Sequence, residues 1–75
     1  MDKPIEVFLV WDAGRGDHGE APELMALFAS VDDALDYAKK AFEKDAWEDC
    51  VIENWITGLD QAQASYTLAE NQAQA

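Results

Sequence analysis

The chain has 75 residues, of which 16 are acidic and 5 basic, giving a formal net charge of −11 at pH 7. A chain this short forms one domain, and its thin core leaves no room for a large cofactor cavity. Because nucleic acids and anionic membranes are bound through lysine and arginine, this charge excludes both as ordinary partners and favours a basic protein surface.

Cysteine usage and hydropathy indicate an intracellular protein. Cys50 is the single cysteine, so an intrachain disulfide and a thiolate metal cluster are both impossible, and we expect a small buried hydrophobe there. No run approaches 18 apolar residues, and the first residues, MDKPIEV, lack the basic and apolar regions of a signal peptide. We therefore expect a soluble, cytoplasmic protein.

Two strands are predicted in the first 30 residues. Residues 5–11, IEVFLVW, alternate with a period of two, and both faces are apolar in the middle, which is typical of a central strand. Residues 23–30, ELMALFAS, suit a helix by propensity alone. The strand interpretation is favoured because Pro22 and the preceding glycines suit a hairpin connection and because a helix start follows directly.

A helix is predicted from Ser30 onward, in SVDDALDYAKKAFEKD. Ser30 and Asp33 have the spacing of a capping box, with aspartate in place of the usual glutamate. Acidic residues occupy the first turns and lysines the last, which complements the helix dipole. The apolar positions recur at helical spacing and are Val31, Ala34, Leu35, Ala38, Ala41 and Phe42.

A third strand and a tail complete the chain. Residues 46–58 return to strand character, whereas residues 61–75 are rich in Ala and Gln and are expected to be a helical or disordered tail. The predicted fold is α+β in β-β-α-β order, with a three-stranded antiparallel sheet in residues 1–60, one helix on one face and a flexible C-terminal tail. Because one helix cannot cover both faces, we expect an open apolar patch containing Trp55 with Phe8, Val10 or Met25.

The glycine-rich loop after the first strand matches known motifs without their context. Gly14 to Gly19 spells GxGxxG, but the dinucleotide fingerprint requires a helix at the third glycine, and here another strand follows. The RGD tripeptide at residues 15–17 is explained by turn formation alone. We predict no cofactor and no metal, and keep as a third hypothesis a metal-binding loop whose oxygen and imidazole ligands would be Asp12, Asp17, His18, Glu20 and Glu23.

The sequence indicates no catalytic residues. The chain has one histidine, one cysteine and serines only at positions 30 and 65, and His18 and Cys50 fall in separate predicted elements. With 16 acidic residues, carboxylate pairs arise by chance. We therefore predict that the protein is not an enzyme.

The acidic residues have two interpretations. Individually they stabilise a helix end and solvate edges and loops. Together, residues 43–53, EKDAWEDCVIE, would combine with the helix N-terminus and the glycine-rich loop into negative rows that imitate a nucleic-acid backbone. Tryptophan is enriched among interface hot spots, and Trp47 or Trp55 is the expected anchor. The predicted partner-binding residues are Asp32, Asp36, Glu48, Asp49, Glu53 and Trp55.

The segments VFLVWD, ELMALFASVDDALDYAKKA and VIENWITGLD resemble a group of small uncharacterised bacterial and phage domains of the β-β-α-β type. The likeness covers residues 5–60, with Ala26 in place of the group's usual glycine. Its matched positions are Val7 to Leu9, Phe28, Ser30, Asp33, Ala34, Tyr37, Ile52 and Leu59-Asp60. The resemblance implies the fold and no catalytic residue. In composition alone, the chain also resembles acidic phage-encoded inhibitors of bacterial defence systems, such as anti-CRISPR proteins.

The leading hypothesis is a small acidic protein-binding domain, possessing no enzymatic activity, that docks on a basic nucleic-acid-binding partner and inhibits it. The alternative is a self-associating structural domain that forms a homodimer through an open sheet face or an edge strand. The metal-binding loop is the third hypothesis.

Overall fold

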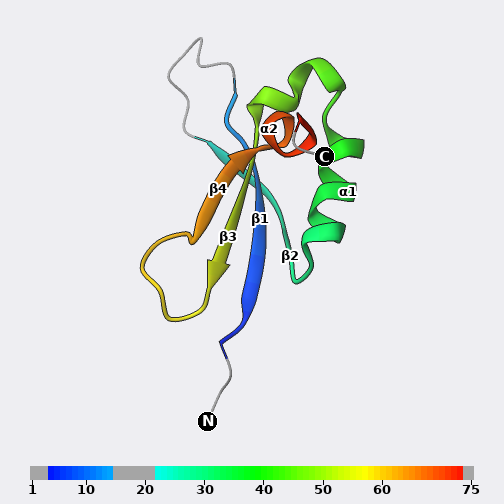
Figure 1. The fold of residues 1–75 in the computed structure, drawn as a ribbon. Coiled ribbons are helices and arrows are strands. Elements are labelled where there is room, and N and C mark those ends of the chain that lie inside the picture. The colour runs from blue at the N-terminus through cyan, green and yellow to red at the C-terminus, as the bar shows by residue number, and fades with distance from the viewer. Residues whose placement is uncertain (1–3, 15–21, 74–75) are drawn as a thin grey trace.

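The strands that the structure describes form one four-stranded antiparallel sheet, in the order β2-β1-β3-β4 (Figure 1). The computed structural model describes residues 4–14 and 22–73. The elements are β1 (Glu6–Asp12), β2 (Glu23–Phe28), α1 (Val31–Ala41), the 3-10 helix η1 (Lys44–Asp49), β3 (Cys50–Ile56), β4 (Ala64–Thr67) and α2 (Leu68–Ala73). The predicted α+β class is confirmed, and β1 is a central strand as its two apolar faces indicated.

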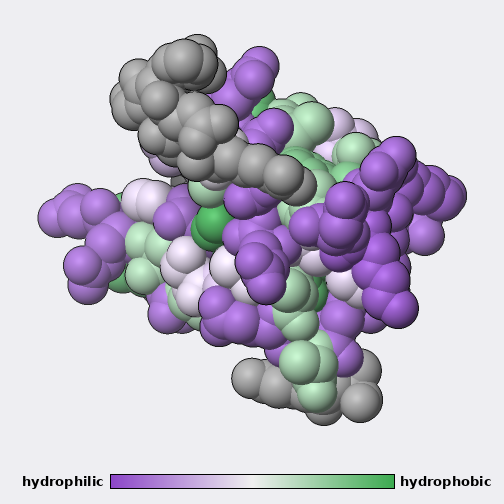
Figure 2. All heavy atoms as spheres, turned by 90° about the horizontal axis from the view of Figure 1, so that it is seen from above, coloured by the Kyte–Doolittle hydropathy of each residue, from purple (hydrophilic) through white to green (hydrophobic). Residues whose placement is uncertain are grey.

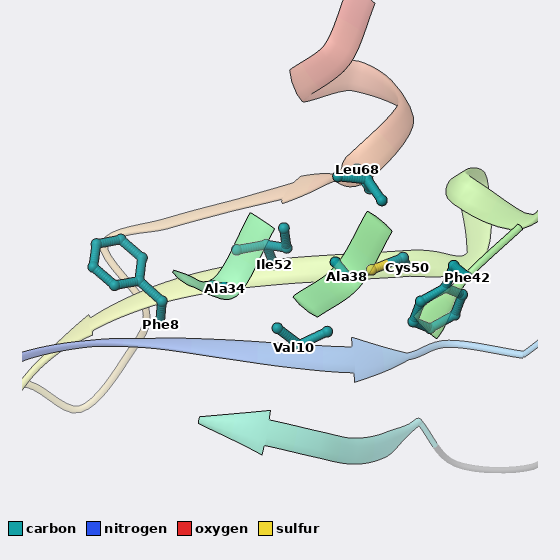
Figure 3. Close-up of a cluster of buried hydrophobic side chains, with 8 residues drawn as sticks. All are labelled: Phe8, Val10, Ala34, Ala38, Phe42, Cys50, Ile52 and Leu68. Carbon is teal, nitrogen blue, oxygen red and sulfur yellow. The ribbon is translucent and has the colours of Figure 1, made fainter. Parts of the chain in front are cut away.

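The core lies between the sheet and the two α-helices, which sit on the same side of the sheet (Figures 1 and 3). Successive side chains of β1 and β3 point to opposite faces of the sheet, so every second side chain points toward the helices. Small side chains on the inner face of α1 let that helix approach the strands closely. The buried residues are Phe8, Val10, Ala34, Ala38, Phe42, Cys50, Ile52 and Leu68.

The expectation of three strands and one helix is wrong, because the structure describes four strands and a second α-helix. The segment expected to be a tail contains β4, which pairs with β3, and α2, whose first residue Leu68 is fully buried in the core. The Thr67 hydroxyl accepts a hydrogen bond from the backbone N–H of Glu70 at 3.0 Å and donates one to the Glu70 carboxylate at 3.2 Å. Isolated helices of six residues are unstable in water, so α2 depends on this side-chain cap and on Leu68 packing.

The connection between α1 and β3 also differs from the expectation. Residues 44–49 form η1, and β3 begins at Cys50 rather than at residue 46. The indole N–H of Trp47 donates a hydrogen bond to the Phe42 carbonyl at 3.1 Å, and the ring packs against the core. Trp47 is therefore a structural residue that fastens η1 to the end of α1.

The start of α1 is at the predicted place but without the predicted side-chain cap. Ser30 has the extended backbone of an N-cap residue, and its carbonyl accepts the first helical hydrogen bond from Ala34 at 3.1 Å. Its hydroxyl makes no capping hydrogen bond, so the capping box expected at Ser30 and Asp33 is wrong. The helix is instead specified by its apolar stripe and by the acidic and basic residues at its two ends.

Candidate functional site

The sheet face opposite the helices is not covered by any element in the described part of the chain. The register between strands assigns residues to this face, because directly paired residues of neighbouring strands share a face. Val7 pairs with Trp55, Leu9 with Glu53, and Trp11 with Val51. We call this surface the open face; it consists of Val7, Leu9, Trp11, Leu24, Leu27, Val51, Glu53 and Trp55, with the polar Ser65 and Thr67 on β4.

A β-bulge places an additional leucine on the open face. Regular alternation along β2 would put Leu24 on the same face as Phe28, and the pairing shifts by one residue between Val10 and Trp11. Leu24 consequently pairs with Trp11 rather than lying on the covered face. The bulge thus extends the apolar surface to the end of the sheet.

Exposure separates the two faces clearly. Val10 and Ile52, on the covered face, have no accessible surface, whereas Leu24 is 46% exposed and Leu27 57% exposed. Val7, Leu9, Trp11, Val51 and Trp55 are half-buried by their neighbours on the same face. The open face is therefore a contiguous apolar surface of half-buried and exposed side chains, the kind of surface that is common at protein interfaces.

The expected open patch contains the wrong residues of β1. Phe8 is 9% exposed and Val10 is fully buried, so both belong to the core instead of the patch. Met25 is exposed but lines a hollow beside Phe42, on the helical side. Only Trp55 of the expected patch lies on the open face.

The predicted partner-binding residues fall into separate regions. Glu53 and Trp55 lie together on the open face, where the Trp55 indole N–H donates a hydrogen bond of 3.3 Å to Glu53 Oε1. Asp32 and Asp36 lie on α1, which packs on the opposite face, and Asp36 pairs with Lys40 at 3.1 Å. The remaining two, Glu48 and Asp49, end η1.

Charge is distributed unevenly over the molecule. The basic residues that the structure describes are Lys39, Lys40 and Lys44, in α1 and η1, while the open face has the Glu53 carboxylate as its one described charge. Seen from above and coloured by hydropathy, hydrophilic residues gather at the right of the view, on the α1 side, and again at the left (Figure 2). The open face therefore combines an apolar surface with a negative centre and no described cation.

The metal-binding hypothesis has little support in the described residues. Asp17, His18 and Glu20 lie outside them, and within residues 4–14 and 22–73 no group of three or more histidine, cysteine or acidic side chains could hold a metal ion. The Asp12 carboxylate accepts a hydrogen bond from the Gly14 N–H at 2.8 Å. Gly14 has a φ of 67°, a conformation that favours glycine, so this pair builds a turn.

An acidic hollow of about 450 Å³ lies on the helical side, between the ends of β1 and α1 and the 3-10 helix η1. Its apolar lining includes Met25 and Phe42, and its carboxylates are Asp12, Glu43, Asp45 and Asp49. Water hydrates the carboxylates of such a concave surface easily, so a group of acidic residues there defines no ligand by itself.

The thiol of Cys50 is unsuited to nucleophilic chemistry. It is fully buried in the core, as expected of a small hydrophobe. Burial, with a smaller contribution from the negative charge of Asp12, raises the pKa of Cys50 to about 11. Because the thiolate is the reactive form, this thiol is inert near neutral pH.

Sequence reasoning missed Trp11, Leu9 and Leu27 as candidate binding residues. It assumed that the more apolar face of β1 lies inside. Glu53 could have indicated the correct face, because a helix packed on its side of the sheet would bury an unpaired carboxylate at a high cost in free energy. The face of β3 that avoids this cost contains Cys50 and Ile52, and it is the face that the helices cover.

Comparison with known proteins identifies no relative: no family model, no curated protein and no solved structure matches this chain. The resemblance to small bacterial and phage domains thus stays a prediction. Among residues 4–14 and 22–73, no helix has the length and apolar character that crossing a bilayer requires.

Proposed function

We propose that this domain is a protein-binding module that docks on a basic partner through the open face and performs no catalysis. The observation that carries the proposal is the composition of that face, which has exposed leucines and two half-buried tryptophans, Trp11 and Trp55, around one described charge. Large rigid aromatic side chains with a polar N–H are the typical anchors of protein interfaces.

Electrostatics indicates the chemistry of the partner. The net charge of −11 creates a negative field that accelerates association with a basic surface and repels nucleic acids and anionic lipids. Asp32, Asp36 and Glu48 lie outside the open face and act at a distance, whereas Glu53 meets the partner directly. A basic surface that otherwise binds nucleic acid fits this description, and its occupation would inhibit that binding.

The absence of catalysis is part of the same proposal. It is supported by the inert state of Cys50 and by the apolar character of the open face. Enzyme sites need a nucleophile or base held against an orienting group.

The proposal is tested by capturing partners from a bacterial lysate on the full-length chain, identifying them, and measuring each purified partner's Kd by surface plasmon resonance. Leu27→Ala and Leu59→Ala form a matched pair, because Leu27 is 57% and Leu59 50% exposed and Leu59 lies outside the strands. We expect Trp55→Ala and Leu27→Ala each to raise the Kd of a basic partner at least tenfold. Leu59→Ala should leave this Kd unchanged.

Rates sharpen this test. Asp32→Asn combined with Asp36→Asn is expected to lower the association rate and the salt dependence, while Trp55→Ala raises the dissociation rate. Equal affinities for Leu27→Ala and Leu59→Ala, or affinity that does not change between low and high salt, would overturn the proposal.

One observation favours homodimerisation as a second candidate. The outer edge of β2 pairs with no described strand, and Leu24, Met25 and Leu27 along it are exposed. The two functions differ in the sign of their salt dependence. Two chains of −11 repel, so a homodimer tightens as salt increases, whereas a complex with a basic partner loosens. Light scattering of the isolated chain at both salt concentrations distinguishes them.

A further inference from the structure

A small pocket lies at one end of the open face. Its volume is about 200 Å³, and it is lined by Trp11, Ala13, Pro22, Val51 and Glu53. Sites for cofactors and small-molecule substrates usually measure about 300–1,000 Å³. A liquid water molecule occupies about 30 Å³, so this pocket has the capacity of several waters or of one long side chain.

Among the described residues that line the pocket, Glu53 has the one charged side chain. Trp11, Val51 and Pro22 offer apolar surface, and Glu53 contributes the charged group. An apolar wall with a carboxylate at one point matches a lysine or arginine side chain, whose methylene groups bury easily while its charged end remains polar. An aromatic ring in the wall strengthens the attraction for a cation.

The Glu53 carboxylate is available for such a cation. It accepts a hydrogen bond from the Trp55 indole N–H, which is long at 3.3 Å and occupies one of its two oxygens. The lysines that the structure describes belong to α1 and η1 and not to the sheet. A carboxylate has about four acceptor positions, so Glu53 retains capacity for a charged donor.

We infer that this pocket receives one basic side chain of the partner, with the cation on Glu53 and the aliphatic stem against Trp11 and Val51. The inference rests on the proposed function and names the anchor that a basic partner would insert. An arginine should bind in the pocket more tightly than a lysine, because its planar guanidinium stacks on aromatic rings and binds carboxylates through two donors.

The pocket is tested without the partner, by titrating the ¹⁵N-labelled full chain with N-acetyl-arginine amide at constant ionic strength. N-acetyl-citrulline amide has nearly the same shape and no charge, and N-acetyl-lysine amide tests the preference for arginine. We expect saturable NMR shift changes at Trp11, Ala13 and Val51, with citrulline binding at least fivefold more weakly than arginine.

Two variants test whether the Glu53 charge and the free volume of the pocket are needed for binding, and a third is the control for charge. Glu53→Gln is expected to weaken arginine binding at least fivefold, while Asp33→Asn, an equal charge change on α1, leaves it unchanged. Ala13→Leu fills the pocket and is expected to weaken all three compounds. Equal binding of arginine and citrulline, or shift changes elsewhere on the molecule, would overturn the inference.

The two proposals fail separately. If no amino-acid amide binds in the pocket but Leu27→Ala still weakens binding of the partner, the inference about the pocket is wrong and the proposed role of the open face stands. If arginine binds in the pocket but open-face variants capture every partner normally, the proposed function is wrong and the pocket stands as a binding site for basic side chains.

Discussion

On β1, Phe8 and Val10 point toward the helices, whereas Val7, Leu9 and Trp11 point away from them. Both sets are apolar, and the set that is left uncovered contains the larger number of bulky side chains. The decisive difference lies on β3, where the covered face has Cys50 and Ile52 and the open face has Glu53. Helices cover the face that can be buried without desolvating a charge, and the apolar residues opposite stay half-buried or exposed.

Truncating the core and the open face should have very different costs, and this is the largest expected effect. Ile52→Ala removes a fully buried side chain at the centre of the covered face and is expected to lower the free energy of unfolding by about 2–5 kcal/mol. Leu27→Ala removes a 57% exposed side chain and should cost less than about 1 kcal/mol. Urea denaturation followed by tryptophan fluorescence measures both. Similar costs for the two would mean that the open face is part of the core.

The C-terminal segment extends the comparison to α2. Leu68→Ala is expected to cost about 2–3 kcal/mol, the lower part of the range for buried leucines, because a short terminal helix can shift to fill the space. Leu59→Ala, at 50% exposure, is the control and should stay within about 1 kcal/mol. A negligible effect of Leu68→Ala in the same denaturation experiment would show that α2 does not contribute to the core.

Alkaline pH tests the burial of the covered face chemically. The pKa of Cys50 is raised from 9.0 to about 11 in the folded protein, so between these values the unfolded chain loses its proton first. The stabilisation is therefore complete below pH 9 and is lost as the pH rises toward 11, by about 2–3 kcal/mol.

Cys50→Ala removes this contribution and is the variant to compare. Burial also raises the pKa of Tyr66, so part of the alkaline loss of stability will remain in the variant. The measurement is urea denaturation from pH 8 to 11, and identical pH profiles for the two proteins would contradict the assignment to Cys50. Slow reaction of the native thiol with a disulfide reagent at pH 8 is expected as well.

The smallest expected effect compares the two helix starts. Thr67→Ala removes both hydrogen bonds with Glu70 and should cost about 1 kcal/mol. Ser30→Ala should cost less, because the Ser30 hydroxyl makes no capping hydrogen bond. Thermal or urea denaturation of the two variants side by side decides this, and a larger loss for Ser30→Ala would reverse the comparison.

Two residues of the candidate site were predicted from the sequence, but most of its residues were not. Trp55 and Glu53 were predicted as binding residues, and the structure brings them within hydrogen-bond distance on the open face. Trp11 was missed because its face of β1 reads as an ordinary core face. Leu24 was missed because the bulge in β2 reverses its direction, and a bulge leaves no mark in the apolar pattern.

Local patterns determined where the chain forms strands and helices. The alternation in β1, the apolar stripe of α1 and the T-x-x-E capping pattern before α2 are all legible in the amino-acid order, although only the first two were recognised as such. The net charge and the single cysteine likewise follow from composition. These features depend on neighbours within a few residues, which is the range that a sequence pattern describes.

Tertiary structure decided which face of the sheet the helices cover and whether residues 64–73 join the fold. Both outcomes depend on contacts between segments far apart in the chain, such as Leu68 packing against the covered face and Glu53 remaining on the open one. Which face is covered depends on two free-energy costs, that of burying a carboxylate and that of leaving tryptophans uncovered. These costs can be compared only once the strands are paired and their faces are defined.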